Sequence, residues 1–115
     1  MSSVRYNIIT MQNRIEVFEQ MLAADPSNTM VMFGLAKEYE KLGEDAKVIG
    51  LLERYFSSAD DQGNAYGVLA RAYFRAGDTA KARAAYEDGI KAALAHGHPS
   101  MAEEYQMAIE DDLGG

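Results

Sequence analysis

The stretch LAKEYEKLGEDAKVIGLLERY, residues 35–55, decides the fold, because the chain repeats its pattern 34 residues later. The later copy, LARAYFRAGDTAKARAAYEDG, occupies residues 69–89. Both copies carry Leu, Ala, Tyr and Gly at equivalent places, and the shared glycines are Gly43 and Gly77. A pattern repeated at a fixed period is typical of proteins in which one structural unit stacks on the next. The sequence therefore predicts a repeat architecture.

The apolar residues of each copy recur at the spacing of one helix face, as Leu35, Ala36, Tyr39 and Leu42 illustrate. Nothing in the chain alternates apolar and polar residues with the period of a strand, so we expect an all-α fold without a sheet. The predicted helices lie near residues 10–24, 28–42, 45–57, 62–76, 79–96 and 100–112.

The predicted helices are separated by recognisable turn signals. Gly43 and Gly77 stand where a left-handed residue closes a helix. Ser27 or Asn28 is able to cap the second helix. Ser100, with Glu103 three residues later, predicts a capping box at the start of the last helix. Each full copy therefore reads as a helix, a tight turn and an antiparallel helix.

A helix–turn–helix unit of 34 residues resembles the tetratricopeptide repeat. The family's first-helix pattern is matched by Met32-x2-Leu35-Ala36-x2-Tyr39 and by Tyr66-x2-Leu69-Ala70-x2-Tyr73, and its second-helix pattern by Val48-x3-Leu52 and Ala82-x3-Tyr86. Phe18 lies 34 residues before Leu52, and Pro26 falls where a closing proline belongs. The resemblance implies a single-domain, right-handed α-solenoid with a half repeat at 10–27, full repeats at 28–61 and 62–95, and a capping helix at 100–112.

The departures from the family pattern concern residue size. Ala36 and Ala70 replace glycine where neighbouring helices approach closely, and tryptophan is absent. Gly67 falls inside a predicted helix, where alanine is expected to add about 1 kcal/mol of helix propensity. Gly77→Val is therefore expected to destabilise the fold more than Gly67→Ala, because it places a β-branched residue at a left-handed position.

Composition excludes several classes of function. The net charge is −7, and the segment from Met101 onward holds five acids and no base, so the preceding residues are nearly neutral. Nucleic-acid binding is not expected, because it requires clustered Lys and Arg. The absence of cysteine excludes disulfides and thiolate sites. No apolar run reaches the ~20 residues of a membrane span. We expect a cytoplasmic protein without a membrane anchor.

No catalytic or metal constellation emerges from the sequence. His96 and His98 are the only histidines, and no third ligand is evident beside them. The glycines form no phosphate-binding loop. We therefore expect a protein that is not an enzyme and that holds no cofactor and no metal.

The tetratricopeptide resemblance implies a concave groove that binds a partner protein or peptide. The family's groove positions carried by this chain include Glu40 and Gly67, and the predicted partner-binding residues are Met30, Phe33, Lys37, Lys41, Asn64, Arg71, Phe74 and Arg75. Lys37 and Arg71 are equivalent positions, as are Lys41 and Arg75, so four bases share one face. A partner segment that is acidic or ends in a carboxylate, with an apolar anchor, would suit them. An ordinary solvated face is the alternative.

One family function is not written in these residues. The two-carboxylate clamp for chaperone tails requires Lys and Asn at set groove positions. Phe33 and Gly67 occupy the Lys positions, whereas Lys37 and Arg71 occupy the Asn positions. The most favoured function is a non-catalytic adaptor. Self-assembly as a homodimer through the half repeat, and a small regulatory subunit of an enzyme, are the alternatives.

Overall fold

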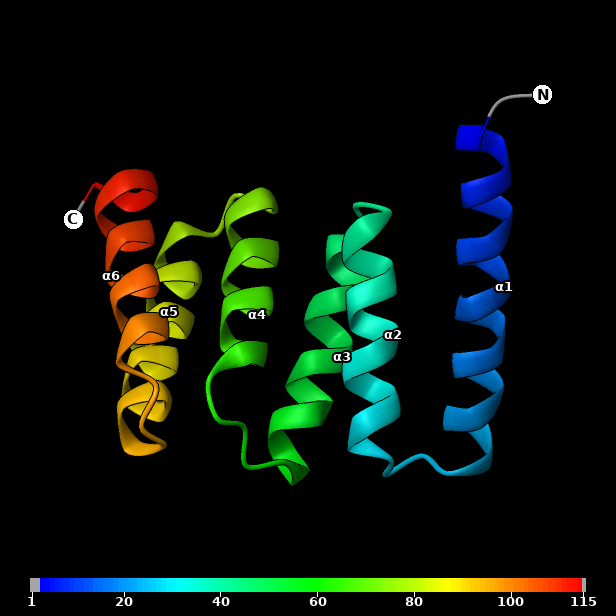
Figure 1. Ribbon diagram of the computed structural model, residues 1–115, viewed down its shortest axis with the longest axis horizontal. Helices are drawn as coiled ribbons and strands as arrows, with labels where there is room; N and C mark the ends of the chain where they lie inside the picture. The colour runs from blue at the N-terminus through cyan, green and yellow to red at the C-terminus, as the bar shows by residue number, and fades with distance from the viewer. Residues whose placement is uncertain (1–2, 115) are drawn as a thin grey trace.

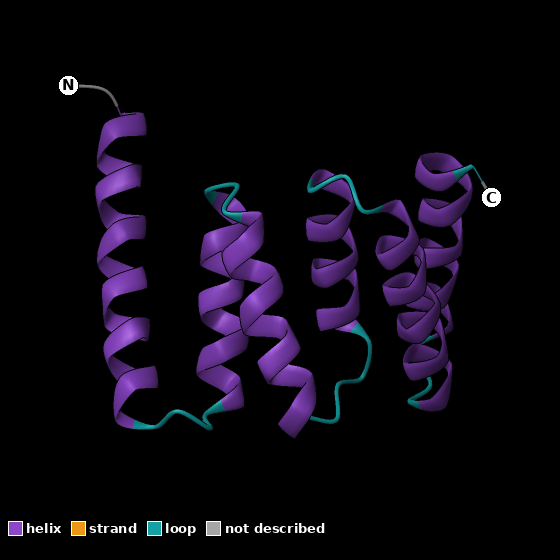
Figure 2. Cartoon of the chain, turned by 180° about the vertical axis from the view of Figure 1, so that it is seen from behind, coloured by secondary structure: helices purple, strands orange, loops and turns teal. Residues whose placement is uncertain are grey.

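The computed structural model describes residues 3–114, and within them the side chains of Thr10 and of residues 12–114. This part of the chain contains helices and no strand, which confirms the all-α prediction. The helices are α1 (Ser3–Ala24), α2 (Thr29–Lys41), α3 (Asp45–Ser58), α4 (Asn64–Arg75), α5 (Thr79–Ala95) and α6 (Pro99–Leu113). They follow one another across the molecule in chain order, with α1 and α6 at opposite ends (Figure 1). The reverse view shows short loops joining antiparallel neighbours (Figure 2).

Two helix starts differ from the prediction. Helix α1 begins at Ser3 rather than near residue 10. Helix α6 begins at Pro99, and its N-cap residue is His98, without a side-chain capping bond. The predicted Ser100 cap is therefore wrong, because proline is favoured in the first helical turn, where its fixed φ already matches the helix. At α2 the prediction is confirmed, since the Asn28 side chain accepts a hydrogen bond from the Val31 N–H at 3.2 Å.

The two glycine turns have the predicted conformation. Gly43 and Gly77 have φ values of 72° and 88°. The N–H of Glu44 donates to the carbonyl of Tyr39 at 3.0 Å, and the equivalent bond from Asp78 to Tyr73 measures 2.9 Å. These bonds satisfy carbonyls that the ending helix would otherwise leave unpaired. Each full copy is therefore a helical hairpin closed in the same way.

A three-residue contact recurs at the 34-residue period and ties consecutive helices together. The Tyr39 hydroxyl donates to Glu19 at 2.6 Å, and the Tyr73 hydroxyl donates to Glu53 at 2.8 Å. The ammonium groups of Lys47 and Lys81 lie over the two tyrosine rings, 5.0 and 5.7 Å from their centroids. Burial and the neighbouring carboxylate raise the pKa of each tyrosine to about 12.

Helix α6 is fixed by one buried aromatic side chain. Tyr105 lies against Gly67 of α4 and Gly89 of α5, and its hydroxyl donates to the carbonyl of Gly63 at 2.7 Å. A Cβ at Gly67 would lie 2.6 Å from the Tyr105 hydroxyl oxygen, and one at Gly89 would lie 2.8 Å from the Tyr105 ring. The expectation that Gly67→Ala is mild is therefore wrong, because the missing Cβ is the space that Tyr105 occupies.

Candidate functional site

A pocket of about 440 Å³ lies where α2, α4 and α6 come together. We call it the α2–α4–α6 groove. It brings together half of the predicted binding residues, namely Phe33, Lys37, Asn64 and Arg71. Its remaining lining residues are Val68, Met101, Glu104 and Tyr105. The predicted face therefore exists in part as a shared site, and α6 completes it.

The α2 side of this groove is an aromatic surface with a base above it. The Phe33 ring is half-buried and packs at 5.8 Å, centroid to centroid, against Tyr55. The Lys37 ammonium lies 5.9 Å from the centroid of the Phe33 ring. A cation over an aromatic face is attracted by the ring quadrupole. The two side chains therefore present an apolar surface and a positive charge at one place.

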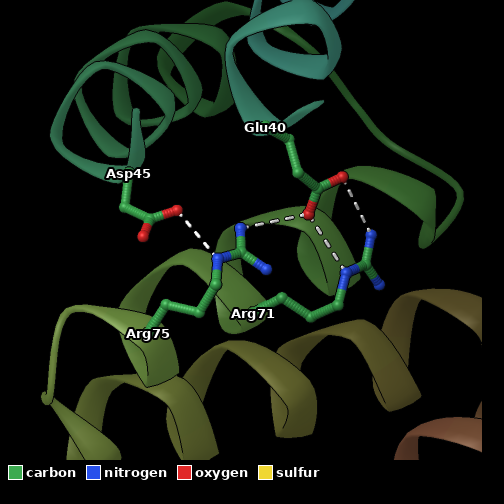
Figure 3. Close-up of polar contacts among 4 residues, drawn as sticks. All are labelled: Glu40, Asp45, Arg71 and Arg75. Carbon is green, nitrogen blue, oxygen red and sulfur yellow. Dashed lines mark hydrogen bonds and ion pairs between the residues drawn. The ribbon is translucent and has the colours of Figure 1, made fainter. Parts of the chain in front are cut away.

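The arginines of α4 are held by acids that belong to the preceding hairpin (Figure 3). Arg71 makes two hydrogen bonds to the Glu40 carboxylate, at 3.1 and 3.4 Å. Arg75 contacts the same carboxylate at 3.3 Å and Asp45 at 2.9 Å. Burial raises the pKa of Glu40, but both arginines outweigh it and hold that pKa below its ordinary value. The face that the sequence presents as four bases is therefore partly neutralised by the chain itself.

Lys41 belongs to the contact between α1 and α2. Its ammonium lies 2.9 Å from Glu38, and Arg14 of α1 lies 2.7 Å from the other oxygen of the same carboxylate. Glu38 is buried, which by itself raises its pKa, but the hydrogen bonds from Arg14 and Lys41 bring that pKa below its ordinary value. Lys41 accordingly fastens a helix end and does not line the groove.

Three other predicted residues also lie outside the groove lining. Met30 is 83% exposed in the first turn of α2, and Phe74 is 40% exposed near the end of α4. Arg75 lies beside Phe74 and is engaged by Glu40 and Asp45. These side chains flank the groove residues on α2 and α4 in sequence without sharing their pocket.

Sequence reasoning missed the contribution of α6. The residues of this helix that line the groove are Met101, Glu104 and Tyr105, and none of them is among the predicted binding residues. The available signal is the pair of glycines inside predicted helices, Gly67 and Gly89, since both leave room for a large side chain. Only the packed structure identifies that side chain as Tyr105.

The histidines take part in helix-end contacts. A ring nitrogen of His96 lies 2.9 Å from the Ala92 carbonyl, and one of His98 lies 2.9 Å from the Gln62 side chain. Among residues 3–114 no group of three His, Cys, Asp or Glu side chains is placed to hold a metal ion. Over the same residues, no helix has the length and apolar character needed to cross a bilayer.

Comparison with known proteins agrees with the architecture. No protein-family model matches the chain. The chain is 33% identical over 95 residues to the "TPR repeat-containing protein PA0015" of Pseudomonas aeruginosa, a match that covers 83% of this chain and 90% of that protein. The shared length includes far more than one hairpin, so the similarity extends over the stacked unit and not a single motif. The chain therefore belongs to the tetratricopeptide-repeat family, whose members serve generally in protein–protein interaction.

Proposed function

We propose that this chain is a non-catalytic adaptor that acts in the cytoplasm and binds a segment of a partner protein in the α2–α4–α6 groove. The observation that carries the proposal is the pocket itself. It gathers Phe33 and Lys37 from one repeat, Asn64 and Arg71 from the next, and Met101 from the last helix. Aromatic and arginine side chains grouped in a pocket are the types that dominate binding energy at interfaces.

The chemistry of the groove suits a segment with one apolar anchor and a carboxylate. Phe33 and Met101 supply apolar contact area. Lys37 makes no ion pair among the described side chains, and Arg71 is 45% exposed although it contacts Glu40. Glu104 also lines the pocket, so a densely acidic segment is disfavoured by like-charge repulsion. Met30, Lys41, Phe74 and Arg75 are proposed as outer contacts.

A comparison of two charge-reversed baits tests this proposal. The groove bait carries Phe33→Ala with Lys37→Glu, and the control bait carries Lys91→Glu on the exposed surface of α5. Circular dichroism first establishes that both baits fold. A protein from native extract that is retained by the wild type and the control, but not by the groove bait, supports the adaptor. Equal retention by all three baits contradicts the groove. If the retained protein is an enzyme, the chain is its regulatory subunit.

A second candidate function is self-association through α1. Val17 and Met21 of this helix are 53% and 45% exposed, one helical turn apart. A small apolar pocket of about 250 Å³ beside Val17 also includes Phe18. Sedimentation of the wild type and of a Val17→Glu, Met21→Glu variant tests this candidate. A dimer that the variant loses supports self-association, whereas a wild type that is monomeric well above micromolar concentration removes it.

A further inference from the structure

A second groove lies between α1 and α3, with α2 beneath it, and we call it the α1–α3 groove. Its volume is about 610 Å³, within the range of ligand pockets. Leu22, Tyr39 and Leu51 contribute apolar surface, Gly50 lies in its wall, and Lys47 and Arg54 complete the α3 side. No lining residue is shared with the α2–α4–α6 groove.

Gly50 is an unexplained glycine in the middle of α3. Glycine in a helix interior costs about 1 kcal/mol relative to alanine. Three other helical glycines are accounted for by a neighbour, because a Cβ would lie 3.3 Å from Phe18 at Gly34 and within 3 Å of Tyr105 at Gly67 and Gly89. At Gly50 nothing lies within 4 Å of the Cβ position. The internal packing of the chain therefore does not require this glycine.

The next repeat provides an internal comparison. Both places are built over the same contact of Tyr, Glu and Lys, formed by Tyr39 in the first and Tyr73 in the second. The residues 34 positions after Leu22, Gly50 and Arg54 are Phe56, Ala84 and Asp88. The first groove thus carries smaller side chains at two positions and a base in place of an acid. These exchanges leave it wider and more positive than its counterpart.

The bases of the α1–α3 groove are available to a ligand. Lys47 and Arg54 are exposed, and neither makes an ion pair among the described side chains. Arg54 donates one hydrogen bond to the carbonyl of Pro26 at 3.0 Å, and Lys47 lies over the Tyr39 ring. The one acid in the lining, Glu19, accepts the Tyr39 hydroxyl. The exposed charge along α3 is therefore complementary to carboxylates.

We propose that the α1–α3 groove binds an amphipathic, acidic helix of a partner protein. A helix fits because the groove is bordered by two helices, and because a glycine in a helix wall lets another backbone approach closely. Its small or apolar face lies against Gly50 and Leu51, and its carboxylates lie beside Lys47 and Arg54. This site is independent of the proposed adaptor groove, since the two have no residue in common.

The test uses a displayed library of helical peptides of about 16 residues, long enough for an isolated helix to form in part. Selection on the wild type is followed by counter-selection on Gly50→Gln, which fills the glycine gap without changing the charge of the groove. Gly50→Gln is expected to fold at least as stably as the wild type, because the position is open and glutamine is a better helix former. Arg54→Asp, which copies the acid of the second groove, tests the charge separately.

The expected result is a set of peptides that need Gly50 and carry acids beside an apolar face. Their dissociation constants should rise about tenfold or more in Gly50→Gln and in Arg54→Asp, but remain unchanged in Phe33→Ala, Lys37→Glu. Peptides that bind the wild type and Gly50→Gln equally, or that are neutral or basic, overturn the proposal. A wild-type dimer that Gly50→Gln abolishes also overturns it, because the occupant is then a second copy of this chain.

Discussion

The two ends of the molecule show two different ways of attaching a terminal helix to the same stack. At one end, α6 is attached through shape, because Tyr105 fills the space above two glycines and donates to the Gly63 carbonyl. At the other end, α1 is attached largely through polar contacts, since Arg14 pairs with Glu38 and Glu19 accepts the Tyr39 hydroxyl. Apolar contacts of Phe18 and Leu22 accompany these bonds.

The difference predicts different sensitivities at the two ends. An aromatic side chain in close contact with backbone is intolerant of small changes in volume, since protein interiors are close-packed. A buried carboxylate held by partly exposed bases is tolerant of volume but sensitive to protonation. Volume changes should therefore loosen α6, and acid should loosen α1.

The largest effect is expected from removing the shape-based attachment. Tyr105→Ala should lower the free energy of unfolding by about 3–5 kcal/mol, because a buried aromatic side chain is lost and a cavity remains. Tyr105→Phe is the matched control and should cost only about 1 kcal/mol for the hydrogen bond to Gly63. Chemical denaturation measures both. Similar losses for the two variants would mean that the hydroxyl, and not the ring, holds α6.

The next effect concerns the glycine beneath the ring. Gly67→Ala should destabilise the fold by about 1–3 kcal/mol, because the added methyl group overpacks against Tyr105. In a Tyr105→Ala background the same substitution should become neutral or favourable, since only helix propensity remains. A double-mutant cycle by denaturation tests the coupling. Additive effects would show that the two residues do not compete for space.

A smaller effect is expected at the polar attachment of α1. The pKa of Glu38 lies below its ordinary value of 4.5, so the ionised form favours the folded state. This contribution is present above that ordinary value and is lost as pH falls through the folded-state pKa. Glu38→Gln should cost roughly 1 kcal/mol at neutral pH, because both bases are about half exposed.

The measurement for this prediction is the difference in unfolding free energy between the wild type and Glu38→Gln as a function of pH. The difference should shrink as the solution is acidified, and amide exchange should accelerate in α1 before it does in α6. A difference that stays constant down to strongly acidic pH would show that the charge of Glu38 does not fasten α1.

The smallest effect contrasts the two kinds of helical glycine. Gly50→Ala, which copies Ala84 of the next repeat, should raise the free energy of unfolding by up to about 1 kcal/mol, since nothing opposes a Cβ there. The opposite sign is expected for Gly67→Ala, although both glycines lie inside helices. Denaturation of the two variants side by side checks the contrast. Loss of stability in Gly50→Ala would show that the groove beside this glycine is closed in solution.

The candidate site was only partly predictable from the sequence. The 34-residue period places Phe33 and Lys37 on one helix and Arg71 on its equivalent, and the structure brings these three to one pocket. The period says nothing of which acids approach them. Glu40 reaches Arg71 and Arg75 across two hairpins, and such a contact depends on the packing angle between units.

The sequence by itself determined the helices, the turns and the stacking pattern. Gly43, Gly77 and the small residues Ala36 and Ala70 act locally, through φ angles and contact distances that a repeat period fixes. Only the tertiary structure decided which charges remain exposed and which glycine stays open. Gly50 and Gly67 are both glycines inside helices, yet one lies beside an open groove and the other beneath Tyr105. The reason is physical: the same local sequence leaves the same space, and what fills it comes from a distant part of the chain.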